Sequence, residues 1–185
     1  MIQDCNLKCS YCYNVWKCEK PYPAGRLDTK GMKGLIERIV EQTGCRILTL
    51  TGGEPYLRDD IVELMRHVKK QGVSLNVITN GTLLDEDLIR KSIEAGVTLF
   101  EIQLPATERD VVRGLMGRDV YDTIVEGISK IKRHDGLVVV AFFIARKVDQ
   151  RRVACLHCGE PIRPGAVVCV HCTREQRQAA VTADP

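Results

Sequence analysis

The sequence lacks long apolar runs, a visible leader and a strong excess of charge of either sign. Its longest apolar stretch, Leu137 to Ala145, has nine residues and is too short to cross a bilayer. No basic segment followed by an apolar stretch opens the chain, so no signal peptide is visible and we expect a cytoplasmic protein. The formal net charge of +3 does not favour a nucleic-acid partner. We therefore expect no membrane span and do not favour a nucleic-acid partner.

Cysteine, in contrast, is abundant, with nine residues, seven of which fall in spacings that resemble metal sites. Without a leader, this usage favours a reducing compartment over disulfide pairing. Cys5, Cys9 and Cys12 form C-x3-C-x2-C. Three thiolates suit a cubane of four irons and leave one iron without a protein ligand, and an open metal position is where chemistry occurs. Two alternatives are three unrelated cysteines and a zinc loop that takes Cys18 as its fourth ligand.

Residues 27 to 144 alternate between helical and strand patterns. Three expected helices begin at Asp28 or Thr29, at Asp59 or Asp60, and at Asp85. A fourth expected helix carries Tyr121, Ile124, Ile128 and Ile131 on one face. Expected strands span 46–51, 73–78, 97–104 and 137–144. This alternation predicts an α/β fold with a parallel sheet. Loops at the carboxyl ends of its strands would bring residues 4–13, 51–55 and 79–81 to one rim.

The segment Thr51-Gly52-Gly53-Glu54-Pro55 can hold a ligand. Its glycines let the backbone approach closely, Pro55 fixes the turn, and Glu54 with the backbone carbonyls can receive an ammonium group. Alone, it is also consistent with an ordinary strand-to-helix turn. Together with the three cysteines and the aromatic Tyr11 before the third of them, it resembles the radical S-adenosylmethionine (radical SAM) family.

That resemblance implies a 4Fe-4S cluster and SAM as cofactors, with SAM chelating the open iron. An electron from the cluster would cleave SAM to methionine and a 5'-deoxyadenosyl radical, which abstracts hydrogen from a substrate. Residues expected to contact SAM are Tyr11, Gly52, Gly53, Glu54, Pro55, Asn80 and Gln103. Tyr11 is alternatively a packing residue, and Asn80-Gly81 a plain turn. The segment Gln103-Leu104-Pro105-Ala106 departs from the Ser-Leu-Asp-Gly of many relatives, which puts the ribose contact of Gln103 in doubt.

The barrel that the resemblance implies is incomplete. Radical SAM cores usually have six strand-helix units, whereas this chain shows four clear strands, with only residues 1–3 left for another before the cysteines. We predict a partial (β/α) barrel over residues 1–148, with residues 137–144 as an uncovered edge. Such an edge favours self-association or pairing with a partner chain.

Residues 149–185 form a second segment with four further cysteines. Cys155, Cys158, Cys169 and Cys172 are spaced C-x2-C-x10-C-x2-C, which is typical of a closed structural zinc site. The segment resembles a zinc ribbon. Rubredoxin-like iron and a small auxiliary iron-sulfur cluster are the alternatives.

The function predicted from these features is a radical SAM enzyme that abstracts hydrogen from its substrate. The stretch Cys12-Tyr13-Asn14-Val15-Trp16 loosely resembles peptide- or protein-modifying members, which suggests a peptide substrate. An electron donor such as flavodoxin or ferredoxin would be needed. The rival is a non-catalytic iron-sulfur and zinc protein that docks a partner protein.

Overall fold

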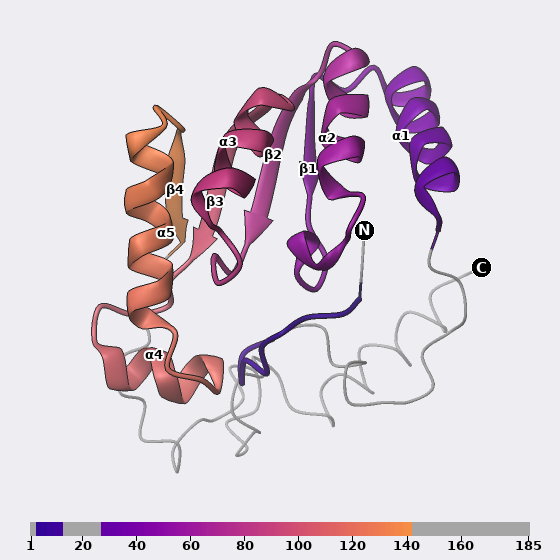
Figure 1. The fold of residues 1–185 in the computed structure, drawn as a ribbon. Coiled ribbons are helices and arrows are strands. Elements are labelled where there is room, and N and C mark those ends of the chain that lie inside the picture. The colour runs from indigo at the N-terminus through magenta and orange to yellow at the C-terminus, as the bar shows by residue number, and fades with distance from the viewer. Residues whose placement is uncertain (1–2, 13–26, 142–185) are drawn as a thin grey trace, which may run out of the picture. The chain divides into compact units, whose positions relative to one another are not determined.

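The computed structural model of the chain describes residues 3–12 and 27–141 (Figure 1). The chain divides into two compact units, Met1–Phe143 and Ile144–Pro185, and all the described residues belong to the first. The predicted zinc ribbon and Cys18 lie outside the described residues.

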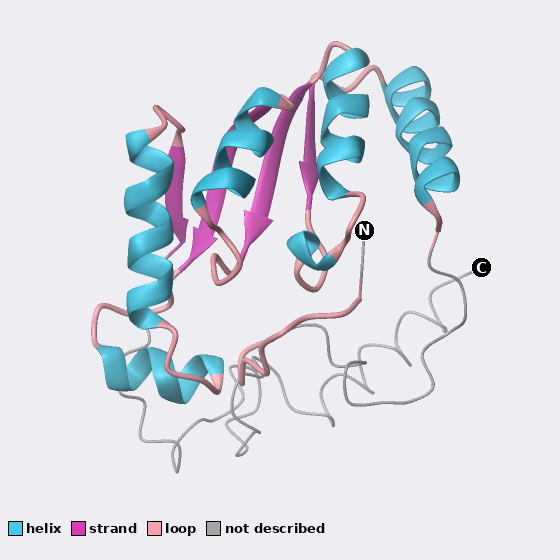
Figure 2. Ribbon diagram, in the orientation of Figure 1, coloured by secondary structure: helices cyan, strands magenta, loops and turns pink. Residues whose placement is uncertain are grey.

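Four parallel strands form one sheet in the order β1-β2-β3-β4 (Figure 2). They are β1 (Ile47–Leu50), β2 (Ser74–Thr79), β3 (Val97–Gln103) and β4 (Val138–Ala141). This confirms the predicted α/β class, and each strand lies inside or within one residue of its expected range. Gln3 belongs to no strand, and residues 142–144 of the last predicted strand lie outside the described residues.

One helix precedes β1, and the other helices occupy the connections between the strands. They are α1 (Thr29–Thr43), α2 (Ile61–Lys70), α3 (Glu86–Glu94), α4 (Arg109–Met116) and α5 (Tyr121–Arg133), with a short 3-10 helix, η2 (Pro55–Leu57). Two of the predicted caps are confirmed. Asp28 accepts a hydrogen bond from the Gly31 amide at the start of α1, and Asp85 accepts one from the Leu88 amide at the start of α3.

One predicted cap is used differently. Asp60 stands at the N-cap position, directly before α2, but makes no side-chain cap bond. Its carboxylate instead receives two hydrogen bonds from the buried Arg58 guanidinium, at 2.7 and 2.8 Å, and one from the Thr29 hydroxyl at 2.7 Å. These hydrogen bonds hold the pKa of Asp60 at about 2, below its ordinary 3.8. Because Arg58 also donates to the Leu27 carbonyl, the pair fastens the start of α1 to the start of α2.

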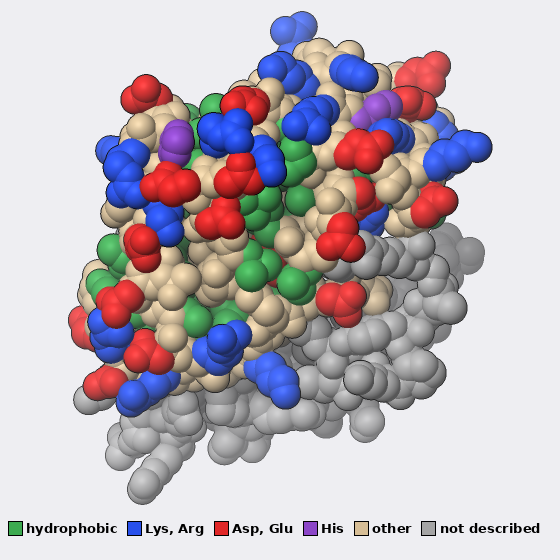
Figure 3. All heavy atoms as spheres, viewed as in Figure 1, with side chains coloured by type: hydrophobic (Ala, Val, Ile, Leu, Met, Phe, Trp, Pro, Cys, Tyr) green, Lys and Arg blue, Asp and Glu red, His purple; other side chains and the backbone are tan. Residues whose placement is uncertain are grey.

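Helices α1, α2, α3 and α5 lie on one face of the sheet (Figure 1). Side chains alternate along the strands, so every second residue points into this layer. Leu75, Val77, Phe100 and Ile102 on that face are fully buried. The outer surface of the helices mixes acidic and basic side chains (Figure 3). This layer is therefore an amphipathic one, apolar toward the sheet and charged toward solvent.

The two edge strands expose apolar side chains within the described residues. Leu137 is 65% exposed and Val139 in β4 is 48% exposed, while Ile47 in β1 is 60% exposed. Because the residues after Ala141 lie outside the described part, pairing of this edge with a partner stays a prediction. Among the described helices, none combines the length and apolarity needed to cross a bilayer.

Candidate functional site

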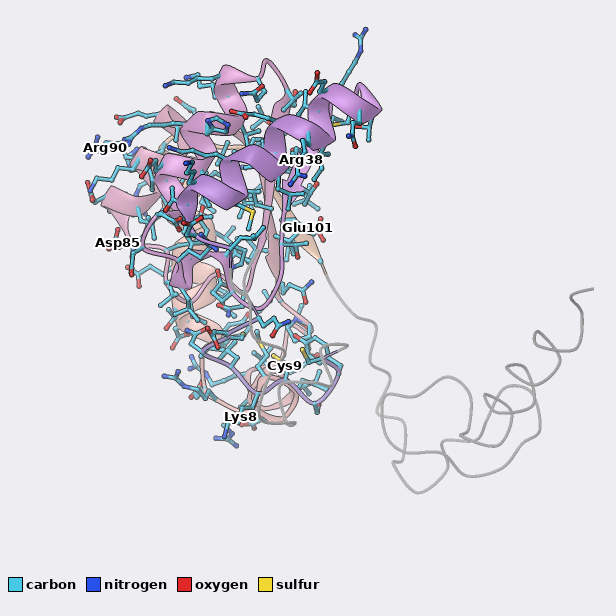
Figure 4. All side chains as sticks on the ribbon, turned by 90° about the vertical axis from the view of Figure 1, so that its right-hand side faces the viewer. Lys8, Cys9, Arg38, Asp85, Arg90 and Glu101 are labelled. Carbon is cyan, nitrogen blue, oxygen red and sulfur yellow. The ribbon has the colours of Figure 1, made fainter. Side chains whose placement is uncertain are left out.

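The loop that carries the three cysteines lies at the carboxyl ends of the strands. Figure 1 shows the N-terminal segment beneath the strand tips, and Figure 4 places Lys8 and Cys9 at one end of the unit, far from Arg90 of α3. Leu7 is 1% exposed and anchors the loop in the core. Within the loop the Cys12 amide donates to the Cys9 carbonyl at 3.2 Å. The cysteine loop therefore lies beside the carboxyl ends of the strands, as predicted.

Residues 51–55 hold the start of this loop through their backbone. The Glu54 amide donates to the Asp4 carbonyl at 2.8 Å. A Cβ added to Gly53 would lie 2.0 Å from the Asp4 carbonyl oxygen and 2.6 Å from that of Gln3, a separation that no side chain tolerates. Gly53 is thus required by the close approach of the chain's own backbone.

The Glu54 carboxylate ties this loop to the end of β2. Its Oε1 accepts the Thr79 hydroxyl at 2.7 Å and the Tyr56 amide at 3.2 Å, and its Oε2 accepts the Asn80 amide at 2.8 Å. Glu54 is fully buried. A buried carboxylate is costly unless hydrogen-bonded, and here three donors of the chain compensate it. Its observed contacts are thus structural.

Asn80 links the end of β2 to the cysteine loop. Its Nδ2 donates to the Asn6 Oδ1 at 2.9 Å and to the Cys5 Sγ at 3.7 Å. Its Oδ1 accepts both the amide and the hydroxyl of Thr82, at 2.9 and 2.7 Å. Both donors and both acceptor positions of the amide are occupied by the chain.

The C-terminal end of α4 supports the loop from another side. The Ser10 amide donates to the Leu115 carbonyl at 2.8 Å, and Arg118 donates to the Asn6 carbonyl at 3.4 Å. Met116 is fully buried. The sequence gave no sign of this contact, because its partners lie more than 100 residues apart.

These segments surround a cavity of about 240 Å³. It is lined by Cys5, Cys9, Tyr11, Cys12, Thr51, Gly52, Gly53, Ile78, Thr79, Asn80, Gln103 and Met116. Tyr11 sits among the cysteines: burial raises the pKa of its phenol well above the usual range, and the neighbouring Cys9 adds to that rise. Thiols, an aromatic ring and exposed backbone thus share one chamber.

The predicted site residues divide into two groups. All three cysteines, Tyr11, Gly52, Gly53, Asn80 and Gln103 line the cavity. Glu54 and Pro55 are buried and do not line it. Thr51 and Thr79 also line the cavity, as expected for the segments 51–55 and 79–81. Sequence reasoning missed Ile78 and Met116 as cavity residues. Ile78 directly precedes one of these segments, so the strand-end rule offered a signal for it, while Met116 offered none.

The cysteines fit a cluster better than a single ion. Cys5, Cys9 and Cys12 are half-buried, and neither they nor Cys45 is in a disulfide. Within residues 3–12 and 27–141, no group of three His, Cys, Asp or Glu side chains converges on one metal position. A four-iron cluster needs no such convergence, because each thiolate binds a different iron. The donor set therefore suits iron-sulfur chemistry, with three thiols that line the chamber.

Known proteins share this sequence and fold. The curated relatives include a probable GTP 3',8-cyclase from Pyrococcus abyssi, 36% identical over 135 residues, which are 70% of this chain and 41% of the relative. Another is the Fe-coproporphyrin III synthase of Methanosarcina barkeri, 28% identical over 84% of this chain and 38% of the relative. The chain thus spans about two fifths of the length of these relatives.

Solved structures share the fold at low identity. Methylornithine synthase (PylB) matches with a TM-score of 0.59 and 24% identity over 75% of this chain and 40% of its own. HydG, a maturase of the [FeFe]-hydrogenase, matches with a TM-score of 0.61 and 16% identity over 75% of this chain and 32% of its own. Residues 1–147 match the radical SAM superfamily. With the cysteine loop at the strand ends and this match over most of its length, the chain belongs to the radical SAM superfamily.

Proposed function

We propose that this chain is the cluster- and SAM-binding core of a radical SAM enzyme. The observation that carries the proposal is that Cys5, Cys9 and Cys12 line one cavity with Gly52 and Gly53. When bound, the cluster supplies the electron that cleaves SAM to methionine and a 5'-deoxyadenosyl radical for hydrogen abstraction from the substrate. Membership of the superfamily, over residues 1–147, supports both cofactors.

In this proposal the residues of the chain divide the work. The three thiolates hold the cluster, and Tyr11, the backbone at Gly52 and Gly53, and the Gln103 side chain face SAM. Glu54 and Pro55, which do not line the cavity, support SAM indirectly by fixing residues 51–55 against β2. Asn80 has its amide fully engaged, so a direct contact with SAM would displace one of its present partners.

The cavity supplies only part of a wall for a ligand as large as SAM. Its 240 Å³ lies below the roughly 300 Å³ at which small-molecule pockets begin. We propose that a partner chain that pairs with β4 covers the cavity. The exposed Leu137 and Val139 at that edge support this source.

Anaerobic reconstitution with iron and sulfide tests the proposal. We expect one four-iron cluster per chain and release of 5'-deoxyadenosine on adding SAM and dithionite, or a flavodoxin or ferredoxin as a physiological donor. The C5A/C9A/C12A variant is expected to lose both. Cys45→Ala is the matched control, because Cys45 lies outside the cavity. A cluster with no SAM cleavage would instead support the rival, a non-catalytic protein that docks a partner.

The substrate is proposed by comparison. The sequence relatives named GTP 3',8-cyclases make a purine nucleotide the first compound to test. The peptide predicted from the stretch after Cys12 has no support from these relatives. Deuterium transfer from labelled nucleotide or labelled peptide into 5'-deoxyadenosine would decide between them.

For the tail, we propose one zinc held by Cys155, Cys158, Cys169 and Cys172, on the strength of their spacing. Metal analysis of the full chain and of C155A/C158A tests this. Loss of one zinc, with the iron unchanged, is expected. Loss of additional iron would point to a second iron site.

A further inference from the structure

Asn80 aims a hydrogen-bond donor at the sulfur of Cys5. The Nδ2 to Sγ distance is 3.7 Å, which suits the large sulfur atom. Asn80 is 9% exposed, so water competes little for this donor. The side chain reaches Cys5 from the end of β2, 75 residues along the chain.

The direction of the amide follows from its surroundings. The Thr82 backbone amide has only a proton to offer, and it lies 2.9 Å from the Asn80 side chain. The atom that faces it must therefore be the oxygen, Oδ1. The nitrogen, Nδ2, then faces Cys5 and Asn6. The hydrogen-bond partners therefore decide which end of the Asn80 amide is oxygen and which is nitrogen.

A closed ring of hydrogen bonds locks this arrangement. Asn80 donates to Asn6, Asn6 donates to the Thr82 hydroxyl at 2.8 Å, and that hydroxyl donates back to Asn80. Each side chain gives and receives once around the ring. The second proton on Nδ2 is left for Cys5 alone. Since Asn6 is the residue after Cys5, the ring also fixes the loop against the end of β2.

We propose that Asn80 tunes the reduction potential of the cluster through this hydrogen bond to Cys5. Because it acts through Cys5, Asn80 is a positioning residue. The inference rests on the proposed function. Donors to the sulfur ligands stabilise the more negative, reduced state of an iron-sulfur cluster. The amide would therefore raise the potential and make the cluster easier to reduce.

The test is the reduction potential of the reconstituted full-length protein, followed by electron paramagnetic resonance without substrate. Asn80→Ala is expected to shift the potential to a more negative value, so that a given flavodoxin reduces a smaller fraction of the cluster. Thr82→Val is the matched control. It opens the ring but keeps the backbone amide that orients Asn80, so an unchanged potential is expected. An Asn80→Ala protein with full iron and the wild-type potential, or an equal shift in both variants, would overturn the inference.

If the Asn80→Ala variant binds no cluster, a measurement on the unaltered protein tests the hydrogen bond between Asn80 and Cys5. Protein labelled with ¹⁵N only in asparagine side chains should show a nitrogen coupling to the reduced cluster. The coupling should persist in Asn6→Ala, which removes the other labelled side chain near Cys5. No coupling in the unaltered protein would overturn the inference. Failure of the unaltered protein to assemble any cluster would instead count against the proposed function.

Discussion

The helix layer and the cysteine loop belong to one unit but are held by different forces. The helix layer is stabilised by apolar side chains such as Leu64, Ile89 and Phe100, all fully buried. Leu7 is buried and Cys5, Cys9 and Tyr11 pack partly against the core, but most of the loop's links are hydrogen bonds to residues 51–55, to the end of β2 and to the end of α4. The comparison teaches that the stability of the fold and the assembly of the site can be disturbed separately.

The largest expected effect is on iron content, and it distinguishes Gly53 from Gly34. Gly53→Ala places a methyl group 2.0 Å from the Asp4 carbonyl oxygen, so the cysteine loop must leave its position and most of the iron should be lost. Gly34→Ala is the matched control, because open space surrounds that position inside α1. It should raise the stability by roughly 0.5–1 kcal/mol and leave the iron unchanged. Iron analysis and thermal melting measure both, and equal iron in the two variants would contradict the comparison.

The second prediction concerns the helix layer. Leu64→Ala removes a fully buried side chain of α2 and should cost about 3 kcal/mol in the free energy of unfolding. Its iron content, measured well below the melting temperature, should match that of the wild type. Val125→Ala on α5, where the side chain is 37% exposed, should change the stability by no more than about 0.5 kcal/mol. Urea unfolding checks both, and joint loss of iron and stability in Leu64→Ala would show that the two regions are coupled.

Glu54→Gln tests the connection between the two regions. The new amide would turn an N–H toward a donor, either the Asn80 amide or the pair from Thr79 and Tyr56. We expect a loss of about 2 kcal/mol, the cost of an unsatisfied buried donor, together with weaker iron binding. Glu63→Gln is the control: its side chain is 57% exposed and pairs only with Lys33 among the described salt bridges, so the effect should be about 0–1 kcal/mol. A melting temperature equal to that of Glu63→Gln would contradict the structural role.

The last effect, no larger than that of Glu54→Gln, is a pH dependence confined to the helix layer. The pKa of Asp60 falls from 3.8 to about 2 on folding, so its contribution is present above pH 4 and is lost as the pH falls toward 2. The shift corresponds to roughly 2 kcal/mol in the free energy of unfolding, and solvent screens it little because the side chain is only 16% exposed. Urea midpoints of the metal-free protein at pH 5 and pH 2.5 should show Asp60→Asn approaching the wild type in acid. Asp59→Asn, at an exposed position, should track the wild type throughout.

The elements of the fold were predictable because their signals are local. Apolar residues at helical spacing produced α2, α3 and α5, and Asp28 and Asp85 marked helix starts with side chains that bond three residues ahead. The cap at Asp60 was misread because Arg58, two residues before it, competes for the same carboxylate. A charged partner wins over a neutral amide, and the pattern of residues alone does not show which of the two is in reach.

The sequence by itself determined the parallel sheet, the position of the cysteine loop beside it, and the three thiols that this loop brings to the strand ends. Periodicity and spacing carry that information along short stretches. Only the tertiary structure decided that Glu54 turns toward Asn80, that Asn80 turns toward Cys5, and that α4 closes the cavity with Met116. These partners lie 26, 75 and up to 105 residues apart. A polar side chain is directed by whichever donor or acceptor folding brings beside it, and only the folded chain fixes that neighbour.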